Sequence, residues 1–229
     1  MKNNKPKAAA IIVAAGESQR MGDIDKIFAP LGGEPLIMRS TRAFQECPAI
    51  GQIIVVLSGE HVDKCEHLAG KGDWSKVSDV CAGGERRQDS VTAGLKLVKK
   101  CDWVIVHDGA RPLATVDLIE RGLAAAQETG AAVAAVRVID TIKVVDDNEI
   151  VYETPPRKSL RAVQTPQVFR YDIIMKSYEQ AKGYATDDAS LVEQAGYEVK
   201  LYPGSYDNIK VTTPADLELA GILLKKHEH

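Results

Sequence analysis

The sequence predicts an α/β fold in which helices cover both faces of a mostly parallel sheet. Buried strands are indicated by short apolar runs at 8–15, 53–57, 103–106 and 131–138. The helix-like segments between these runs lie at 36–44, 89–98 and 116–129. Strands that alternate with helices along a chain are typical of parallel sheets. The chain has 229 residues, 45% of them hydrophobic, which suffices for one large core, so we expect a single domain, 1–229.

The first half of the chain carries clear local signals. Residues 8–15 are followed by Gly16, which indicates a buried strand that enters a glycine turn. The alternating pattern at 76–81 predicts a further strand. Asp89 is expected to cap the N-terminus of the helix at 89–98.

The segment 141–152 interrupts the alternation of strands and helices. Apolar residues flank the turn-forming sequence at 146–148, which predicts a β-hairpin. Pro155 and Pro156 then stiffen the connection back to the core. Such a hairpin arm has to pack on its own body or reach a second subunit, and the residues leave both alternatives open.

The last third returns to alternating elements. Helices are expected at 172–181 and 187–195, and strands at 198–202 and 208–211. The final helix has a clear start, with Thr213 as N-cap, Pro214 at its first position and Asp216 in its first turn.

Composition argues against several classes of protein. Lysine and arginine number 29 and aspartate and glutamate 32, a net charge of −3 that disfavours nucleic-acid binding. No apolar run approaches the roughly 20 residues of a membrane span. The four cysteines form no CxxC pair, so they are interpreted as reduced thiols and not as zinc ligands. We therefore expect a cytoplasmic enzyme with no nucleic-acid or membrane partner.

Polar clusters follow the predicted strands, where ligands bind in open α/β sheets. The first is the glycine-bearing loop 16–22, which contains Arg20 and is followed by Lys26. Glycine amides and two cations suit phosphate groups, although a tight turn with solvated cations is the alternative. The loop lacks the Gly-Lys-Ser/Thr ending of a Walker loop. It also lacks the GxGxxG of a dinucleotide fold, which disfavours a nicotinamide oxidoreductase.

Two more clusters follow later strands. Gly84 and Arg87 lie in a second glycine-led loop that opens a helix, a further candidate anion site. Asp108 follows the run 103–106 and is a candidate for holding a metal ion or a ribose hydroxyl, the alternative being a helix cap. His107 is interpreted as a hydrogen-bonded core residue. The remaining polar clusters, each of which could also be ordinary surface, are Arg157, Arg161, 164–167, 186–188 and 207–210.

Taken in order, these clusters resemble the cytidylyltransferases of the non-mevalonate isoprenoid pathway. The resemblance covers nearly the whole chain and is carried by Ala14-Ala15-Gly16 with Arg20-Met21, Gly83-Gly84 with Arg87 and Asp89-Ser90-Val91, His107-Asp108 with Ala110-Arg111-Pro112, Asp140-Thr141, Thr165-Pro166-Gln167, Thr186-Asp187 and 207–212. It implies a Rossmann-like nucleotidyltransferase fold of the GT-A-like type, a three-layer sandwich with a protruding β-hairpin arm. The flanks of Lys26 depart from the family pattern, because Asp25 and Ile27 stand where Pro and Gln are usual.

The resemblance also implies a reaction and a set of site residues. CMP would pass from CTP to 2-C-methyl-D-erythritol 4-phosphate, with Mg²⁺ held mainly by the CTP phosphates and Asp108 as a candidate ligand. Arg20 and Lys26 would stabilise charge on the α-phosphate, and Arg157 and Lys210 would complete the catalytic set. CTP would contact Ala14, Ala15, Gly16, Gly84, Arg87 and Ser90. The acceptor would contact Asp108, Arg111, Thr141, Thr165 and Thr186, beside Arg157 and Lys210.

The resemblance further implies a homodimer, in which the arm 141–157 joins the subunits and Arg157 reaches the neighbouring site. Two alternatives stay open. A ribitol-5-phosphate cytidylyltransferase would share the fold and many of these motifs. A nucleotide-binding regulator without catalysis belongs to another class, and the retention of Arg20, Lys26, Asp108 and Lys210 argues against it.

Overall fold

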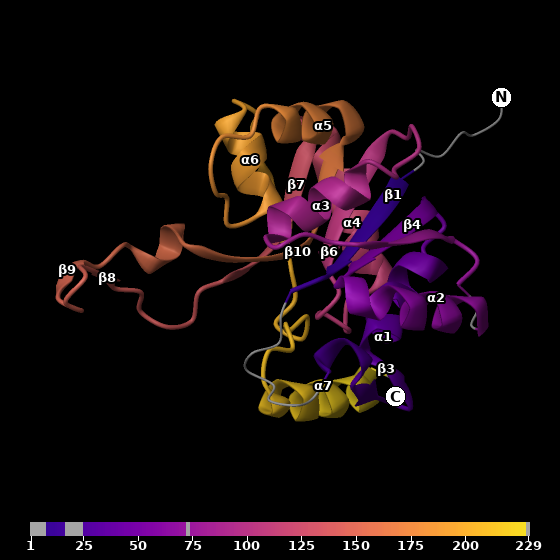
Figure 1. The fold of residues 1–229 in the computed structure, drawn as a ribbon. Helices are drawn as coiled ribbons and strands as arrows, with labels where there is room; N and C mark the ends of the chain where they lie inside the picture. Colours follow the sequence, from indigo (N-terminus) through magenta and orange to yellow (C-terminus); the bar gives the residue numbers. More distant parts are fainter. Residues whose placement is uncertain (1–7, 17–24, 72–73, 228–229) are drawn as a thin grey trace.

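A seven-stranded sheet forms the centre of the protein. The computed structural model describes residues 8–16, 25–71 and 74–227. The strand order in the sheet is β11-β7-β10-β6-β1-β4-β5, and only β10 runs antiparallel to its neighbours (Figure 1). The strands are β1 (Ala8–Ala14), β4 (Ile50–Leu57), β5 (Val77–Ala82), β6 (Trp103–Asp108), β7 (Ala131–Arg137), β10 (Arg161–Arg170) and β11 (Lys200–Pro203). The prediction of a mostly parallel sheet is thus confirmed.

Helices cover both faces, which gives the three layers expected. Alternate residues of β1 point to opposite faces, so Ile12 packs in one core and Ile11 in the other. The first face is covered by α1 (Leu36–Glu46), α2 (Val62–Lys71) and α4 (Val116–Thr129). The second is covered by α3 (Arg87–Leu95), α5 (Tyr171–Glu179) and α6 (Asp188–Gln194). Within the described ranges, no helix is long and apolar enough to cross a membrane.

The last helix, α7 (Pro214–His227), packs away from the main sheet. It lies against the short strand β2 (Pro30–Leu31), which pairs with β3 (Glu34–Pro35). Leu31, Ala220 and Leu224 belong to this third apolar cluster. The Thr213 hydroxyl accepts a hydrogen bond from the Asp216 N–H at 3.3 Å, as expected for an N-cap. The helix follows the segment that carries Lys210 and fixes the end of that segment.

Two local predictions were wrong. Asp89 does not cap α3, because the helix begins at Arg87; the Asp89 carboxylate instead accepts the Arg86 N–H at 3.2 Å, as the third residue of a capping box. The segment 208–211 is not a strand. It is irregular because its backbone N–H groups bond locally: those of Asn208 and Ile209 donate to the Ser205 and Asp207 carbonyls at 3.1 and 2.9 Å. The buried Asn208 side-chain amide also ties the segment to the Thr165 carbonyl at 2.8 Å.

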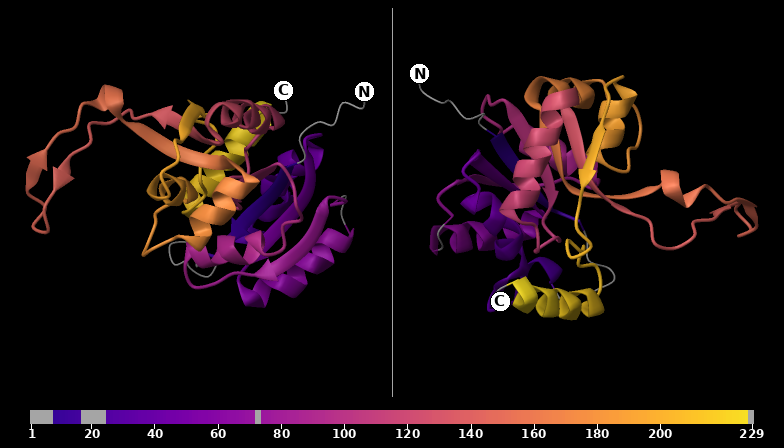
Figure 2. Two further views of the ribbon diagram at one scale, coloured as in Figure 1. Left: turned by 90° about the horizontal axis from the view of Figure 1, so that it is seen from above. Right: turned by 180° about the vertical axis from the view of Figure 1, so that it is seen from behind.

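The predicted hairpin is present and projects from the body of the protein. Strands β8 (Val144–Val145) and β9 (Val151–Glu153) pair antiparallel. One Asp146 carboxylate oxygen accepts the N–H groups of Asn148 and Ile150, both at 2.9 Å, which fixes the turn. The arm extends to one side in both views of Figure 2, and its residues Ile150 and Tyr152 are 64% and 68% exposed.

The close approach of α4 to the sheet gives a stability prediction. A Cβ at Gly122 would lie 2.6 Å from the Tyr202 hydroxyl and 2.9 Å from a Val168 methyl. We expect Gly122→Ala to lower the free energy of unfolding by about 1–3 kcal/mol, because overpacking outweighs the better helix propensity of alanine. Gly70 of α2 has no atom within 4 Å of its would-be Cβ, so Gly70→Ala is the matched control. Urea unfolding at neutral pH measures both, and equal midpoints for the two variants would contradict the packing explanation.

Candidate functional site

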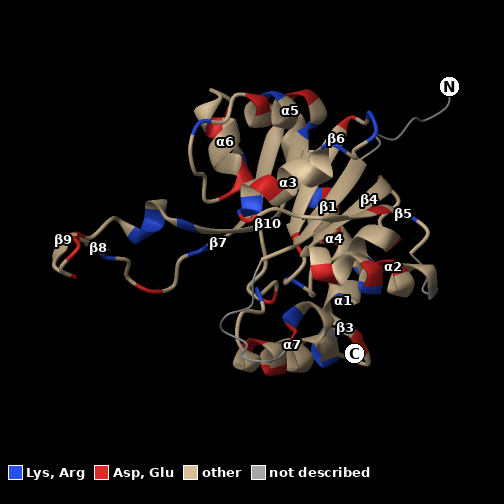
Figure 3. Cartoon of the chain, viewed as in Figure 1, with Lys and Arg blue, Asp and Glu red and all other residues tan. Residues whose placement is uncertain are grey.

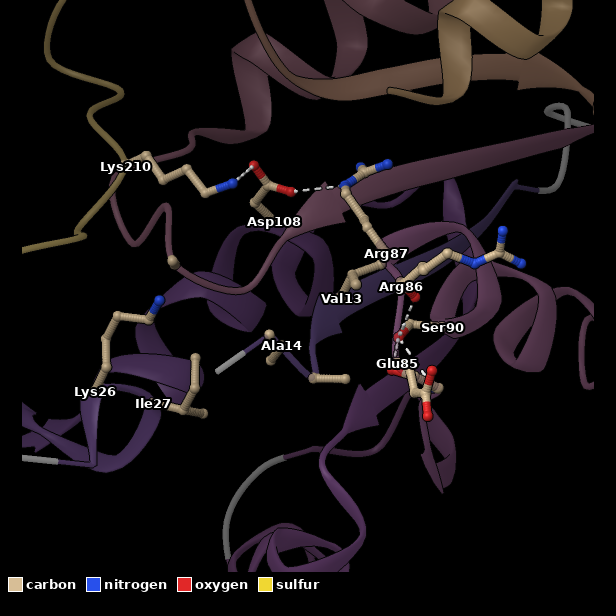
Figure 4. Close-up of a pocket in the computed structure, with 14 residues that line it drawn as sticks. Val13, Ala14, Lys26, Ile27, Glu85, Arg86, Arg87, Ser90, Asp108 and Lys210 are labelled. Atoms are coloured by element: carbon tan, nitrogen blue, oxygen red, sulfur yellow. Dashed lines mark hydrogen bonds and ion pairs between the residues drawn. The ribbon is translucent and has the colours of Figure 1, made fainter. Parts of the chain in front are cut away.

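A pocket open to solvent lies where the carboxyl ends of β1 and β6 meet the start of α3 (Figure 4). The space between its walls, open solvent included, is about 650 Å³. The side chains and backbone that line it come from Val13, Ala14, Ala15, Gly16, Lys26, Ile27, Gly84, Glu85, Arg86, Arg87, Ser90, Asp108, Ala110 and Lys210. The position agrees with the expectation that ligands bind beyond the carboxyl ends of the strands.

The loop before α3 packs tightly against the end of β1. A Cβ at Gly83 would lie 2.5 Å from the Ala15 Cβ and 2.5 Å from the Ser90 hydroxyl oxygen, so only glycine fits without a shift. The Ser90 hydroxyl accepts the Gly84 N–H at 3.2 Å. This packing brings a glycine loop and a helix N-terminus to the pocket, both of which favour anionic ligands.

Asp108 is the carboxylate around which the cations of the site are arranged. Its carboxylate lies 2.9 Å from the Lys210 ammonium, 3.4 Å from Arg87 Nε and 3.6 Å from Arg111 Nε. Burial alone would raise the pKa of Asp108, but the charges of Lys210, Arg87 and Arg111 outweigh it and hold that pKa well below its usual range. Arg111 also donates to the Asn208 carbonyl at 2.6 Å. Three cations from separate parts of the chain therefore converge on one carboxylate.

His107 and Thr165 support Asp108 from behind. His107 Nε2 lies 3.1 Å from the Arg111 carbonyl oxygen, which can only accept, so Nε2 carries the proton. Burial lowers the pKa of His107 to about 4, and its neutral Nδ1 accepts from the Thr165 hydroxyl at 3.1 Å. The same hydroxyl oxygen accepts the Asp108 N–H at 3.0 Å. His107 is thus a buried, hydrogen-bonded residue, in agreement with its interpretation from the sequence.

Lys26 reaches the pocket from a short 3-10 helix, η2 (Lys26–Phe28). The residue before it, Asp25, lies 3.1 Å from His61 Nε2 and 3.5 Å from the Lys64 ammonium. The Lys64 ammonium in turn lies 3.7 Å from the centre of the Phe28 ring. The unusual aspartate beside Lys26 is therefore anchored to the region before and within α2.

The structure brings together most, but not all, of the residues expected at the site. Those that line the pocket are Ala14, Ala15, Gly16, Lys26, Gly84, Arg87, Ser90, Asp108 and Lys210. Arg111 and Thr165 lie behind it, in contact with Asp108. Thr141, Arg157 and Thr186 do not line the pocket of their own chain. Arg20 lies outside the described residues.

Sequence reasoning missed several members of the site. Glu85, Arg86 and Ala110 line the pocket, and they belong to motifs that were noted without a role for these residues. Asp188 pairs with Arg87; it lies in the polar cluster 186–188, but no role was assigned to it there. Tyr178, which donates to Asp188, was not singled out, and both residues lie more than 90 positions after Arg87. Only the three-dimensional arrangement places that pair beside the pocket.

Comparison with known proteins decides the family. The family described as 2-C-methyl-D-erythritol 4-phosphate cytidylyltransferase matches residues 8–226. The chain belongs to this family. A cytidylyltransferase of that name from Dehalococcoides mccartyi is 50% identical over 220 residues, which cover 96% of this chain and 97% of the relative.

Solved structures of cytidylyltransferases agree with the fold. A 4-diphosphocytidyl-2C-methyl-D-erythritol synthase from Anaerococcus prevotii superposes with a TM-score of 0.84 at 29% identity, covering 97% of this chain and 100% of that one. A 2-C-methyl-D-erythritol 4-phosphate cytidylyltransferase from Thermus thermophilus gives a TM-score of 0.77 at 32% identity, covering 96% and 99%. The expected nucleotidyltransferase fold, with its three layers, is thereby confirmed.

The buried His107 predicts a pH dependence of stability. Its pKa in the folded protein is about 4 against an ordinary value of 6.5, so the unfolded chain takes up a proton at a higher pH than the folded one. The free energy of unfolding should therefore fall as the pH drops from 6.5 towards 4. At pH 5 the loss from this residue is on the order of 2 kcal/mol. Urea unfolding at pH 7.5 and pH 5 should show a smaller loss for His107→Gln than for the unsubstituted protein, whereas equal losses would contradict the assignment.

Proposed function

We propose that this protein transfers CMP from CTP to 2-C-methyl-D-erythritol 4-phosphate in the synthesis of isoprenoid precursors. The products are 4-diphosphocytidyl-2-C-methyl-D-erythritol and pyrophosphate. Family membership over residues 8–226 supports the reaction. The single structural observation that carries the proposal is the convergence of Lys26, Arg87 and Lys210 on one pocket around Asp108, since cations there favour two phosphate-bearing substrates.

The chemistry is a direct displacement at phosphorus. An oxygen of the acceptor phosphate forms a bond to the α-phosphorus of CTP, and the bond from that phosphorus to the bridging β-phosphate oxygen breaks. A phosphate monoester is largely a dianion near neutral pH, so no general base is needed. Arg20 and Lys26 stabilise the negative charge that grows on the α-phosphate. The main task of the site is to bring two anions together.

Each substrate has its own part of the site in this proposal. CTP contacts Ala14, Ala15, Gly16, Gly84, Arg87 and Ser90, at the end of β1 and the start of α3. The acceptor lies towards Asp108 and Lys210, which are backed by Arg111 and Thr165. The carboxylate suits polyol hydroxyl groups, and Lys210 suits the acceptor phosphate. Thr141 and Thr186 complete the acceptor contacts in the proposal.

Magnesium is proposed to enter with the nucleotide. The described residues contain no group of three or more His, Cys, Asp or Glu side chains that could hold a metal ion. Asp108 is the candidate protein ligand, but its carboxylate already faces three cations, which disfavours a divalent ion held by protein groups alone. The residues present fit Mg²⁺ held mainly by the triphosphate oxygens, where it would neutralise the charge of the departing pyrophosphate.

The arm at 141–157 is proposed to join two subunits into a homodimer. Its exposed apolar side chains favour burial against another surface, and they include Ile142, Val145, Ile150, Val151 and Tyr152. Lys and Arg residues also lie along the arm where it leaves the body (Figure 3). Arg157 donates to the Ile139 carbonyl of its own arm. Because its side chain is exposed on its own subunit, it is available to the acceptor site of a partner subunit.

The reaction is proposed to take place in the cytoplasm. Cys47, Cys65, Cys81 and Cys101 are all free thiols, as is usual in a reducing compartment. Burial raises the pKa of Cys65 to about 12, so this thiol stays protonated and unreactive at neutral pH.

The decisive test of the proposed function is the choice of acceptor. The purified protein is incubated with CTP, Mg²⁺ and either 2-C-methyl-D-erythritol 4-phosphate or ribitol 5-phosphate, and pyrophosphate release is measured. We expect release with the first acceptor and little with the second. The reverse preference would make the protein a ribitol-5-phosphate cytidylyltransferase, and CTP binding without any release would favour a regulator.

The two proposed charge-stabilising residues give a direct prediction. Arg20→Ala and Lys26→Ala should each lower kcat on the order of a hundredfold or more, because a preorganised cation at the transition state is lost. Circular dichroism should stay unchanged in both variants. The unfolding midpoint of Lys26→Ala should also stay unchanged, since Lys26 lines the open pocket and belongs to none of the hydrophobic clusters. Lys96→Ala, which removes an exposed cation outside the pocket lining, is the control. Near-normal turnover in either alanine variant would remove that residue from the mechanism.

Mixing two inactive variants tests the shared site. If Arg157 acts on the partner's pocket, a mixed dimer of Lys26→Ala and Arg157→Ala subunits contains one pocket with both residues intact. Random exchange of equal amounts should then restore about a quarter of the unsubstituted activity. Each variant alone should remain nearly inactive. No recovery after verified subunit exchange would place Arg157 at the site of its own chain, and near-normal activity of Arg157→Ala alone would remove it from the mechanism.

A further inference from the structure

Arg87 is held by a buried carboxylate that does not line the pocket. Its guanidinium Nη2 lies 2.8 Å from Asp188 Oδ2, and its Nε lies 3.4 Å from Asp108 Oδ1. The Asp188 side chain is 0% exposed, whereas Arg87 is 27% exposed where it borders the pocket. Arg87 therefore bridges a carboxylate of the site and a carboxylate of the helical layer behind it.

Asp188 has a second partner on another helix. The Tyr178 hydroxyl of α5 donates to Asp188 Oδ1 at 2.5 Å. Burial, followed by the charge of Asp188, raises the pKa of Tyr178 above its usual range, so the phenol stays protonated and remains the donor. Both oxygens of Asp188 are thus engaged, one by a phenol and the other by Arg87. A buried carboxylate with these partners has little freedom to rotate.

The backbone of Asp188 is also fixed in place. It is the first residue of α6, and the preceding Asp187 caps this helix by accepting the Ser190 N–H at 3.0 Å. Gln167 of β10 donates to Asp187 Oδ2 at 2.8 Å and accepts the Ala189 N–H at 3.1 Å. The start of α6 is therefore clamped to the central sheet, which makes Asp188 a rigid support for Arg87.

The second carboxylate also matters for charge balance. Asp108 faces Lys210 and Arg111 as well as Arg87, so it cannot compensate three cations at once. Asp188 supplies a separate negative charge for Arg87 and leaves Asp108 to Lys210 and Arg111. Burial alone would lower the pKa of Arg87, but Asp188 and Asp108 raise it, so the guanidinium stays charged.

We propose that Asp188 and Tyr178 are positioning residues, which hold the Arg87 guanidinium at the edge of the pocket in the orientation that binds CTP. This rests on the proposed function for the identity of the nucleotide. An arginine fixed before binding loses little conformational entropy when the nucleotide arrives. The effect should therefore fall on CTP affinity and not on the chemical step.

The first measurement tests the positioning itself and needs no ligand. In ¹⁵N NMR spectra of the unliganded protein, the Arg87 Nε–H signal should be sharp and protected from exchange. We expect Tyr178→Phe and Asp188→Asn to broaden it or speed its exchange, while Ser177→Ala leaves it unchanged. Ser177 is the matched control, because it lies beside Tyr178 on α5 and its buried hydroxyl donates to the Ile173 carbonyl at 2.8 Å. An unchanged Arg87 signal in Tyr178→Phe would overturn the proposal.

The second measurement tests the consequence for substrate binding. Calorimetric titration with CTP should give a dissociation constant roughly threefold to tenfold higher for Tyr178→Phe, with a larger rise for Asp188→Asn. The kcat and the KM for the acceptor should stay close to those of the unsubstituted enzyme. Unchanged CTP affinity in Tyr178→Phe, or an equal rise in Ser177→Ala, would overturn the role in binding. Failure of the unsubstituted protein to bind CTP would instead refute the proposed function, and the NMR result would still decide the positioning.

Discussion

The site depends on the pairing of one buried carboxylate, Asp108, with three cations. An unpaired charge at a buried strand end would cost several kcal/mol, so Asp108 is tolerable only when its partners are in place. Arg87 comes from the start of α3, Arg111 from the loop after β6 and Lys210 from the segment before α7. Two distant parts of the chain, at Arg87 and Lys210, are thereby tied to the loop that holds Asp108 and Arg111. The pocket therefore forms only when the whole sheet has folded. The charge pairs that line it also contribute to the stability of the fold.

The same arrangement explains why the pocket suits phosphate groups although the protein is acidic overall. The net charge of the chain is −3, yet the described lining of the pocket contains Lys26, Arg86, Arg87 and Lys210 against Glu85 and Asp108. The positive potential is local and is strengthened by the helix start at Arg87. Asp108 and Asp188 moderate it by fixing cations in position, so that the cations meet an anion without large rearrangement. A phosphate-binding site can therefore be built without a basic surface.

The sequence predicted most of the central fold because its signals there are local. Strands such as β1 are short apolar runs, and α4 was predicted with its observed bounds. Strand β10 was missed because Gln164, Thr165 and Pro166 interrupt its apolar pattern; at this point the pairing register with β7 shifts. Helix α2 was also missed, since charged residues and histidine separate its few apolar residues.

The site was predictable to the extent that it follows the ends of parallel strands. Gly16, Gly84 and Asp108 could be selected because the carboxyl edge of a sheet gathers whatever follows its strands. The pairing of Asp188 with Arg87 and of Tyr178 with Asp188 could not be predicted, although Asp188 lies in the cluster 186–188, because it depends on how α5 and α6 pack on the face of the sheet that α3 also covers. No local pattern distinguishes a buried aspartate at a helix start from an ordinary capping residue. The sequence alone does not show which charged residues pair when they lie far apart in the chain.

The arm and the acceptor side of the site share one structural origin. The arm is the connection between β7 and β10, and its root is held by the antiparallel pairing of Arg161 with Arg137 and of Ala162 with Val136. Four residues after Arg161, the same strand places Thr165 against the backbone of Asp108. The root of the arm and the support of Asp108 therefore lie on one strand, on either side of Val163, after which its pairing register with β7 shifts. In the proposed dimer, subunit contact and acceptor binding would be coupled through β10, because one strand carries both.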